Sequence, residues 1–195
     1  MKHNVLVTGA CGFIGFHTVI RLLNHGYHVI GIDNMNSFYD AGLKELRLSL
    51  LVESDEFTFI RESIENRAKL EEIFQNSDFD MVIHLAGQAG VRSSPSEANY
   101  YIVSNLVGFW NVLDLCRVHE IKHLVYASSS SVYGGQASPP FSTTDSVDFP
   151  QSLYAATKRS NELIAYSISR QFGLPVTGLR FFTVYGPFGR PDMAV

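Results

Sequence analysis

The chain has 195 residues, of which 46% are hydrophobic and 17% charged, a balance typical of one globular domain with a proper core. Its net charge of −4 argues against nucleic-acid binding, and no apolar run approaches the roughly 18 residues of a membrane span. The N-terminus enters an apolar strand without a signal-peptide pattern, and Cys11 and Cys116 are too few for a disulfide framework, so we expect a cytoplasmic protein.

The first forty residues contain a glycine-rich turn between two predicted strands. The apolar run 5–7 predicts a buried parallel strand, and an amphipathic stretch through Leu23 predicts a helix. Between them lies the pattern G-x-x-G-x-x-G over residues 9–15, and a second apolar run, 27–32, ends at Asp33. This order of strand, glycines, helix, strand and acid predicts a dinucleotide-binding unit, whereas the glycine pattern alone would also fit an ordinary turn.

Each part of this unit has a physical role in holding a dinucleotide. Gly9 permits the tight turn out of the strand, Gly12 lets backbone approach a pyrophosphate at the helix N-terminus, and Gly15 lets helix and sheet pack closely. Asp33 can accept hydrogen bonds from the adenosine ribose hydroxyls. Because a carboxylate there repels a 2′-phosphate, and no Arg or Lys immediately follows it, the sequence favours NAD over NADP.

Strands and helices alternate along the rest of the chain. Further strands are predicted at 57–60, 80–85, 124–127 and 175–180, and helices at 41–53, 67–75, about 97–119 and 153–172. With no repeat and no interdomain linker, this alternation predicts an α/β domain with a doubly wound parallel sheet of Rossmann type, in the order 3-2-1-4-5-6. Ligands of such sheets bind at the carboxyl ends of the strands, where the loops of interest lie. His119 and His123 flank a predicted helix end, so no metal pair is expected.

Tyr154 and Lys158 form a second signal. At positions i and i+4 they share one face of the predicted helix 153–172. The ammonium favours the tyrosinate and so lowers a phenol pKa that starts at about 10, which makes Tyr154 a candidate general base for a substrate hydroxyl. Y-x-x-x-K alone usually marks a surface pair, but here it follows the fifth strand of a predicted dinucleotide fold.

A serine cluster, residues 128–131, lies at the end of that fifth strand. One of its hydroxyls can hydrogen-bond the same substrate oxygen and steady the proton transfer. Ser129 is the first candidate and Ser130 the second. For the remaining serines, the alternative is a turn that caps its own backbone.

These motifs resemble the extended short-chain dehydrogenase/reductase superfamily, the NAD-dependent sugar epimerases and dehydratases. The resemblance covers essentially the whole chain and rests on residues 8–15, 84–87, 128–134, 154–158 and 180–187. Within the superfamily the sequence is most similar to the UDP-glucuronate 4-epimerases, through residues 38–40, 88–92, 104–109 and 186–193. The resemblance implies a Rossmann fold, bound NAD and a UDP-sugar substrate of the UDP-glucuronate type.

The resemblance also implies roles for the residues that match the family's motifs. Tyr154 resembles the catalytic base, Lys158 the residue that lowers its pKa and binds the nicotinamide ribose, and Ser129 the hydroxyl partner. The implied cofactor-binding positions are Gly9, Gly12, Phe13, Ile14, Gly15, Asp33, Asn34, Ser63, Ile64, Leu85, Ala86, Asn105, Lys158 and Phe181. The implied substrate-binding positions are Gln88, Arg92, Thr183 and Arg190, the last suited to a uronate carboxylate. The implied reaction moves hydride from sugar C4 to NAD and back to the other face of a 4-keto sugar.

The chain departs from the family pattern at a few places. Ser63 stands where the family usually has an Asp that holds the adenine, and Phe188 where an indole is common. Family members continue beyond the point corresponding to Val195 into a C-terminal substrate domain, so we expect residues 1–195 to form a single dinucleotide-binding domain without it. A homodimer through a four-helix bundle, built from the helices near 97–119 and 151–172, is also implied.

Two alternatives to a 4-epimerase stay open. One is a catalytically silent NAD-binding fragment, because the substrate domain is missing from the sequence. The other is a different NAD-dependent nucleotide-sugar epimerase or dehydratase. A 4,6-dehydratase is disfavoured, since those enzymes usually carry an Asp-Glu pair where this chain has Ser130-Ser131.

Overall fold

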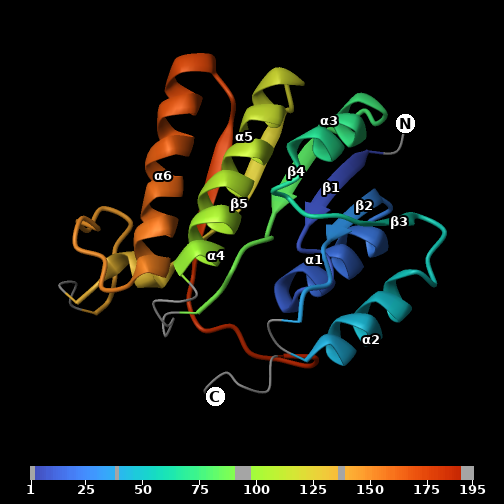
Figure 1. The fold of residues 1–195 in the computed structure, drawn as a ribbon, viewed down its shortest axis with the longest axis horizontal. Coiled ribbons are helices and arrows are strands. Elements are labelled where there is room, and N and C mark those ends of the chain that lie inside the picture. The colour runs from blue at the N-terminus through green and yellow to red at the C-terminus, as the bar shows by residue number, and fades with distance from the viewer. Residues whose placement is uncertain (1–2, 38–39, 91–97, 136–138, 190–195) are drawn as a thin grey trace.

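A six-stranded parallel sheet forms the centre of the molecule, and the computed structural model describes residues 3–37, 40–90, 98–135 and 139–189 (Figure 1). Neighbouring strands pair in parallel in the order β3-β2-β1-β4-β5-β6. The strands are β1 Asn4–Thr8, β2 His28–Asp33, β3 Phe57–Arg61, β4 Met81–His84, β5 His123–Ser129 and β6 Val176–Phe181. The predicted doubly wound sheet and its strand order are confirmed.

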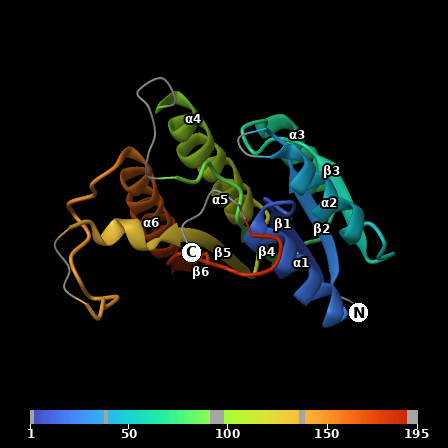
Figure 2. The same ribbon diagram turned by 90° about the horizontal axis from the view of Figure 1, so that it is seen from below.

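Helices cover both faces of the sheet (Figures 1 and 2). On one face lie α1 Phe13–Asn24 and α2 Ala41–Leu51, and on the other lie α3 Arg67–Gln75, α5 Phe109–Val118 and α6 Leu153–Phe172. Each layer encloses its own hydrophobic core. In β1, Val5 and Val7 pack toward α1, whereas Leu6 packs toward α3 and α5, because successive side chains of a strand point to opposite faces.

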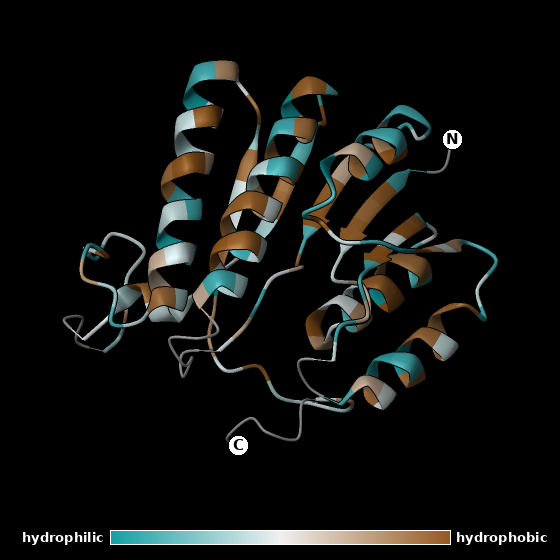
Figure 3. Ribbon diagram, in the orientation of Figure 1, coloured by the Kyte–Doolittle hydropathy of each residue, from teal (hydrophilic) through white to brown (hydrophobic). Residues whose placement is uncertain are grey.

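The central strands are largely hydrophobic, as their brown colour in Figure 3 shows. Strands buried on both faces need near-continuous apolar runs, and residues 5–7 supply one. Among the described residues, no helix combines the length and apolar composition that a membrane crossing requires.

The predicted helix at about 97–119 is a continuous helical stretch, but it is not a uniform α-helix. It consists of α4 Ala98–Ile102, η2 Val103–Gly108 and α5, and the six residues of η2 form a π-helix. A π-helical turn widens the backbone locally and is frequent at functional sites. Residue spacing carries no signal for it, so the sequence predicted a plain helix here.

Helix α6 begins and ends at the predicted residues because both ends are capped. The Ser152 hydroxyl accepts a hydrogen bond from the Ala155 amide at 3.1 Å, and Gly173 closes the helix in the left-handed conformation, with φ of 76°. Before α6, the serine cluster continues from β5 into a short 3-10 helix, η3 Ser130–Tyr133, which the sequence did not predict. Tyr154 is therefore fixed in the first turn of α6.

The segment after β6, residues 182–189, crosses from β6 to α1 and α2 (the red segment in Figure 1). Its Pro187 carbonyl oxygen lies 2.8 Å from His17 Nε2 of α1, and its Phe188 carbonyl accepts from Arg47 of α2 at 2.6 Å. The Phe188 ring packs edge-on against Phe16, with the ring centroids 5.2 Å apart. The two halves of the chain are thus joined beside the glycine-rich turn.

Candidate functional site

The glycine-rich turn leaves a backbone cradle that β-carbons would fill. Gly9 has a φ of +71°, and a β-carbon there would lie 2.7 Å from the backbone nitrogen of Ala86. A β-carbon on Gly12, the residue that precedes α1, would lie 3.0 Å from the Gly9 carbonyl oxygen. A β-carbon on Gly15 would collide with that same oxygen, so Gly15 lets α1 pack against the turn that precedes it, rather than against the sheet as the sequence predicted. The bare backbone at the N-terminus of α1 fits the pyrophosphate of a dinucleotide.

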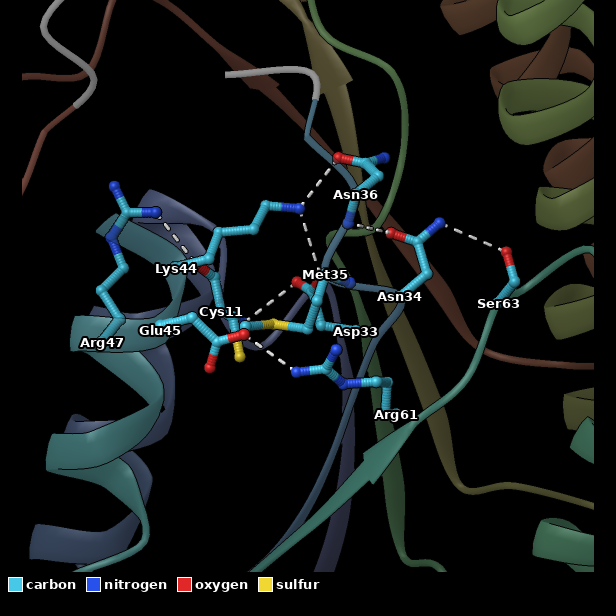
Figure 4. Close-up of polar contacts among 10 residues, drawn as sticks. All are labelled: Cys11, Asp33, Asn34, Met35, Asn36, Lys44, Glu45, Arg47, Arg61 and Ser63. Atoms are coloured by element: carbon cyan, nitrogen blue, oxygen red, sulfur yellow. Dashed lines mark hydrogen bonds and ion pairs between the residues drawn. The ribbon is translucent and has the colours of Figure 1, made fainter. Parts of the chain in front are cut away.

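Asp33, at the end of β2, is buried and tightly held (Figure 4). Its Oδ2 accepts from the Cys11 amide at 3.1 Å, and its Oδ1 accepts from the Met35 amide at 2.9 Å. Oδ1 also accepts from Lys44 Nζ at 3.2 Å, in an ion pair whose two side chains are both almost fully buried. No basic residue immediately follows Asp33 in the sequence, yet α2 brings one to it. The sequence argument for NAD over NADP considered only the charge of Asp33 and did not include Lys44.

Arg47, one helical turn beyond Lys44, is completely buried. Its guanidinium donates to the Cys11 carbonyl at 2.9 Å and to the Phe188 carbonyl at 2.6 Å, so it links the glycine-rich turn to the segment 182–189. Sequence reasoning missed both cations. Their signal was their spacing, because Lys44, Arg47 and the core residue Leu51 lie on one face of α2.

Of the three residues expected at the adenine end of the cofactor, Asn34 and Ser63 lie together and Ile64 does not. Asn34 Nδ2 donates to Ser63 Oγ at 3.3 Å, so these two positions lie side by side at the ends of β2 and β3. The Ser63 hydroxyl also donates to the Glu65 carboxylate. Ile64 differs, since its side chain belongs to the hydrophobic core, against Gly108 of η2. We therefore expect Ile64 to shape the site from beneath rather than to line it.

Asn105, in the π-helical segment η2, fixes the loop that follows β4. Its Oδ1 accepts from the Gln88 amide at 2.7 Å, and its Nδ2 donates to the Gln88 carbonyl at 3.0 Å and to Thr157 Oγ1 at 3.1 Å. Leu85 and Ala86 are held by Thr8 of β1, whose backbone carbonyl and hydroxyl accept from their amides at 3.0 and 3.2 Å. Asn105 and Gln88, expected on the cofactor and substrate sides, are thus both buried in one hydrogen-bonded unit.

Ser129, at the end of β5, lies close enough to Tyr154 of α6 to influence the pKa of its phenol. Ser129 Oγ also accepts from the Ser131 amide at 3.2 Å and from the Ser131 hydroxyl at 2.9 Å. Ser128 points the other way, because β-strand side chains alternate, and its hydroxyl donates to Glu162 at 2.6 Å. The structure therefore separates Ser129, the first candidate from the sequence, from its neighbour Ser128, which the sequence left without a role.

Burial governs the protonation of Tyr154 and Lys158. Burial raises the pKa of Tyr154 above its ordinary value, and the nearby Ser129 hydroxyl offsets only part of that rise. Burial lowers the pKa of Lys158 to about 8. Lys158 Nζ donates to the Ala127 carbonyl at 3.0 Å and lies 5.9 Å from the centroid of the Tyr154 ring. The net pKa of Tyr154 is thus raised, because desolvation of the phenol dominates, and the lowering of that pKa by Lys158 stays a prediction.

The other predicted site residues have varied positions. Phe181 ends β6 directly beside Ser129, Phe13 and Ile14 begin α1, and Thr183 is exposed in the segment after β6. Ser130, the second candidate for the catalytic hydroxyl, begins η3. Arg92 and Arg190 lie outside the described residues. Within the described ranges, no group of three or more His, Cys, Asp or Glu side chains is arranged to hold a metal ion.

The sheet order, the glycine cradle and the Ser129–Tyr154–Lys158 arrangement define a Rossmann-type dinucleotide-binding protein of the short-chain dehydrogenase/reductase kind. Residues 5–195 match the model of the NAD dependent epimerase/dehydratase family, and the chain belongs to that family. NAD is the cofactor of this family, in agreement with the sequence prediction.

Two of the following relatives have names that specify an activity. The chain is 47% identical over 190 residues to the probable UDP-glucuronate 4-epimerase of Rhizobium meliloti, covering 97% of this chain and 56% of that protein. It is 51% identical over 191 residues to Protein CapI of Staphylococcus aureus, covering 98% and 57%. The UDP-glucuronic acid 4-epimerase of Bacillus cereus, solved with UDP-glucuronic acid and NAD, superposes with a TM-score of 0.90 at 39% identity, covering 98% and 60%. The chain thus spans a little over half the length of these proteins.

Proposed function

We propose that this chain is the NAD-binding part of a UDP-glucuronate 4-epimerase, which interconverts UDP-glucuronate and UDP-galacturonate. One arrangement carries the proposal: Ser129 ends β5 beside Tyr154 in the first turn of α6, and Lys158 lies one helical turn further along α6. A tyrosine–serine pair at the carboxyl end of a Rossmann sheet suits proton transfer at a secondary hydroxyl. The names of the relatives support the uronate sugar.

The residues present fit NAD along its whole length. Asp33, Asn34 and Ser63 would hold the adenosine end, and the backbone around Gly12 would hold the pyrophosphate. Lys158 would bind the nicotinamide ribose. When bound, NAD supplies the acceptor and later the donor of the hydride at sugar C4.

The chain's own residues then handle the proton. Tyr154 takes the proton of the C4 hydroxyl, and Ser129 holds the same oxygen in place. Because burial raises the Tyr154 pKa, the tyrosinate needs a nearby cation, and the Lys158 ammonium stabilises it as it forms. The 4-keto sugar turns over in the pocket, and Tyr154 returns the proton after hydride reaches the opposite face.

A dehydratase is a weaker candidate. Such an enzyme needs an acid and a base beside the catalytic hydroxyl, and positions 130 and 131 carry hydroxyls instead. The Ser131 hydroxyl donates to Ser129 Oγ, so it supports the catalytic serine rather than presenting a carboxylate to C5 or C6.

The proposed activity is tested by incubating the chain with NAD and UDP-glucuronate and resolving UDP-galacturonate by anion-exchange chromatography. We expect product from the native chain, and a loss of about 100-fold or more in Tyr154→Phe, with NAD binding unchanged. NAD binding without product would favour the silent NAD-binding fragment. Full activity in Tyr154→Phe would overturn the proposed mechanism.

We further propose that two copies pair through α5 and α6, which lie side by side (Figures 1 and 2). Exposed apolar side chains recur at helical spacing on both helices and on η2, namely Val107, Trp110 and Val118, and Leu163 and Tyr166. A monomer rarely leaves such a stripe in water, and two such helix pairs make a four-helix bundle.

The pairing is tested by light scattering after size exclusion. We expect a dimer from the native chain and a monomer from Trp110→Glu/Tyr166→Glu, because the buried charges would lose their hydration. Val52→Glu is the matched control, since Val52 is equally exposed but lies at the end of α2, so it should stay dimeric. A monomeric native chain at micromolar concentration would contradict the proposal.

A further inference from the structure

Lys44 is a buried cation at the dinucleotide site for which the proposed function has no use. It projects from the first half of α2 and is only 6% exposed. Its Nζ lies 3.2 Å from Asp33 Oδ1 and 3.0 Å from Asn36 Oδ1, so it contacts the carboxylate proposed to receive the adenosine ribose (Figure 4). A buried lysine without a counter-charge is costly, and Asp33 supplies that charge.

We propose that Lys44 is a latent site for the 2′-phosphate of a dinucleotide, blocked by Asp33. The inference rests on the proposed placement of the ribose against Asp33. A 2′-phosphate would stand beside that carboxylate, within reach of the ammonium that now pairs with it. The chain prefers NAD because Asp33 both repels the phosphate and occupies Lys44.

The other charged groups around Asp33 are directed elsewhere. Arg47 donates to the carbonyls of Cys11 and Phe188. Arg61 adjoins Asp33 in the sheet, but it pairs with Glu45 at 2.9 Å, and both of those side chains are more than half exposed to water. An exposed pair is screened by solvent, so its field at the ribose is weak. Lys44, in contrast, pairs directly with the Asp33 carboxylate.

The test is a comparison of NAD and NADP binding by isothermal titration calorimetry on the full chain. Asp33→Asn keeps the shape of the side chain and removes its charge. We expect this single change to raise the affinity for NADP relative to NAD by about tenfold or more, the range of a charge-assisted hydrogen bond. Adding Lys44→Met should abolish that gain, whereas adding Lys44→Arg should keep it.

Arg61→Gln in the Asp33→Asn background is the matched control, because it removes a neighbouring cation that does not contact Asp33. It should leave the gain intact. Asp33→Ser replaces Asp33→Asn if the latter melts early. An equal gain with and without Lys44→Met would overturn the inference, since repulsion by Asp33 alone would then explain it. If Asp33→Asn alters the affinity for neither dinucleotide, the ribose placement itself is wrong.

Discussion

Two adjacent serines at the end of β5 have different surroundings, and this decides their roles. Ser129 lies beside Tyr154 and accepts from the Ser131 hydroxyl, whereas Ser128 donates to Glu162. Glu162 also pairs with Arg180 at 2.9 and 3.0 Å. The first hydroxyl belongs to the candidate site, and the second belongs to a partly buried charged network. The pair therefore offers a matched comparison within one strand.

We predict that Ser129→Ala lowers the turnover of the proposed epimerase by about 10-fold or more and leaves the urea midpoint nearly unchanged. Ser128→Ala should leave turnover nearly unchanged and lower the free energy of unfolding by about 1 kcal/mol, because Glu162 loses a partly buried hydrogen bond. Steady-state kinetics and urea titrations separate the two. Equal kinetic losses in both variants would argue against the assignment.

At the residue level, the motifs predicted which side chains gather, but not how they are charged. Tyr154, Lys158 and Ser129 meet because the helix period and strand ends bring them together, and both follow from local sequence. The raised pKa of Tyr154 and the Lys44–Asp33 pair depend on burial and on a helix that arrives from elsewhere. Those are tertiary properties that no local pattern encodes.

Among the elements, η2 has the most specific task. Its wider π-helical turn carries Asn105, which satisfies both backbone groups of Gln88 and reaches Thr157 on α6. One side chain thus ties the loop after β4 to the helix that bears Tyr154.

We predict that Asn105→Ala lowers the free energy of unfolding by about 2–3 kcal/mol, because it leaves the buried Gln88 amide and carbonyl unpaired. It should also weaken NAD binding, since the loop would no longer be held beside β4. Asn76→Ala, which removes an exposed side-chain bond to the Glu72 carbonyl at the end of α3, is the control and should cost less. Urea unfolding and calorimetric titration with NAD measure both effects. A smaller loss in Asn105→Ala than in Asn76→Ala would contradict the prediction.

The sequence largely predicted where the strands and helices lie. It did not always predict which kind of helix forms. Strands β1 to β6 and helix α6 lie within a few residues of their predicted bounds, because apolar runs and caps mark them. The π-helical character of η2 and the short helix η3 escaped prediction. Both arise from packing, since Gly108 of η2 lies against Ile64 and η3 buries Val132 and Tyr133.

For the whole molecule, two hydrophobic cores enclose a titratable group at the sheet's centre. His84 of β4 is buried, and its Nδ1 lies 2.7 Å from Thr8 Oγ1 of β1. Burial, assisted by the charge of Lys158, lowers the pKa of His84 from 6.5 to about 3. The folded chain therefore keeps this imidazole neutral at pH values where the unfolded chain protonates it.

We predict that stability declines as pH falls below about 6.5, because the unfolded state binds a proton on His84 that the folded state binds only near pH 3. His84→Asn should flatten this decline, with a difference on the order of 2 kcal/mol between pH 4.5 and pH 7. Urea titrations at both pH values measure it, and carboxylates common to both proteins cancel in the comparison. If the native chain and His84→Asn lose the same stability between pH 7 and pH 4.5, His84 is not the group responsible for the decline.

The hydrogen bond between Arg47 and Phe188 also constrains the order in which the parts of the chain can fold during synthesis. The two residues are 141 positions apart, and His17 and Pro187 are 170 apart. A ribosome releases the glycine-rich turn long before either partner carbonyl exists. Contacts of such long sequence separation close late, because their loops carry the largest entropy cost. We therefore expect a nascent chain to acquire its finished nucleotide site only after residue 188 has emerged.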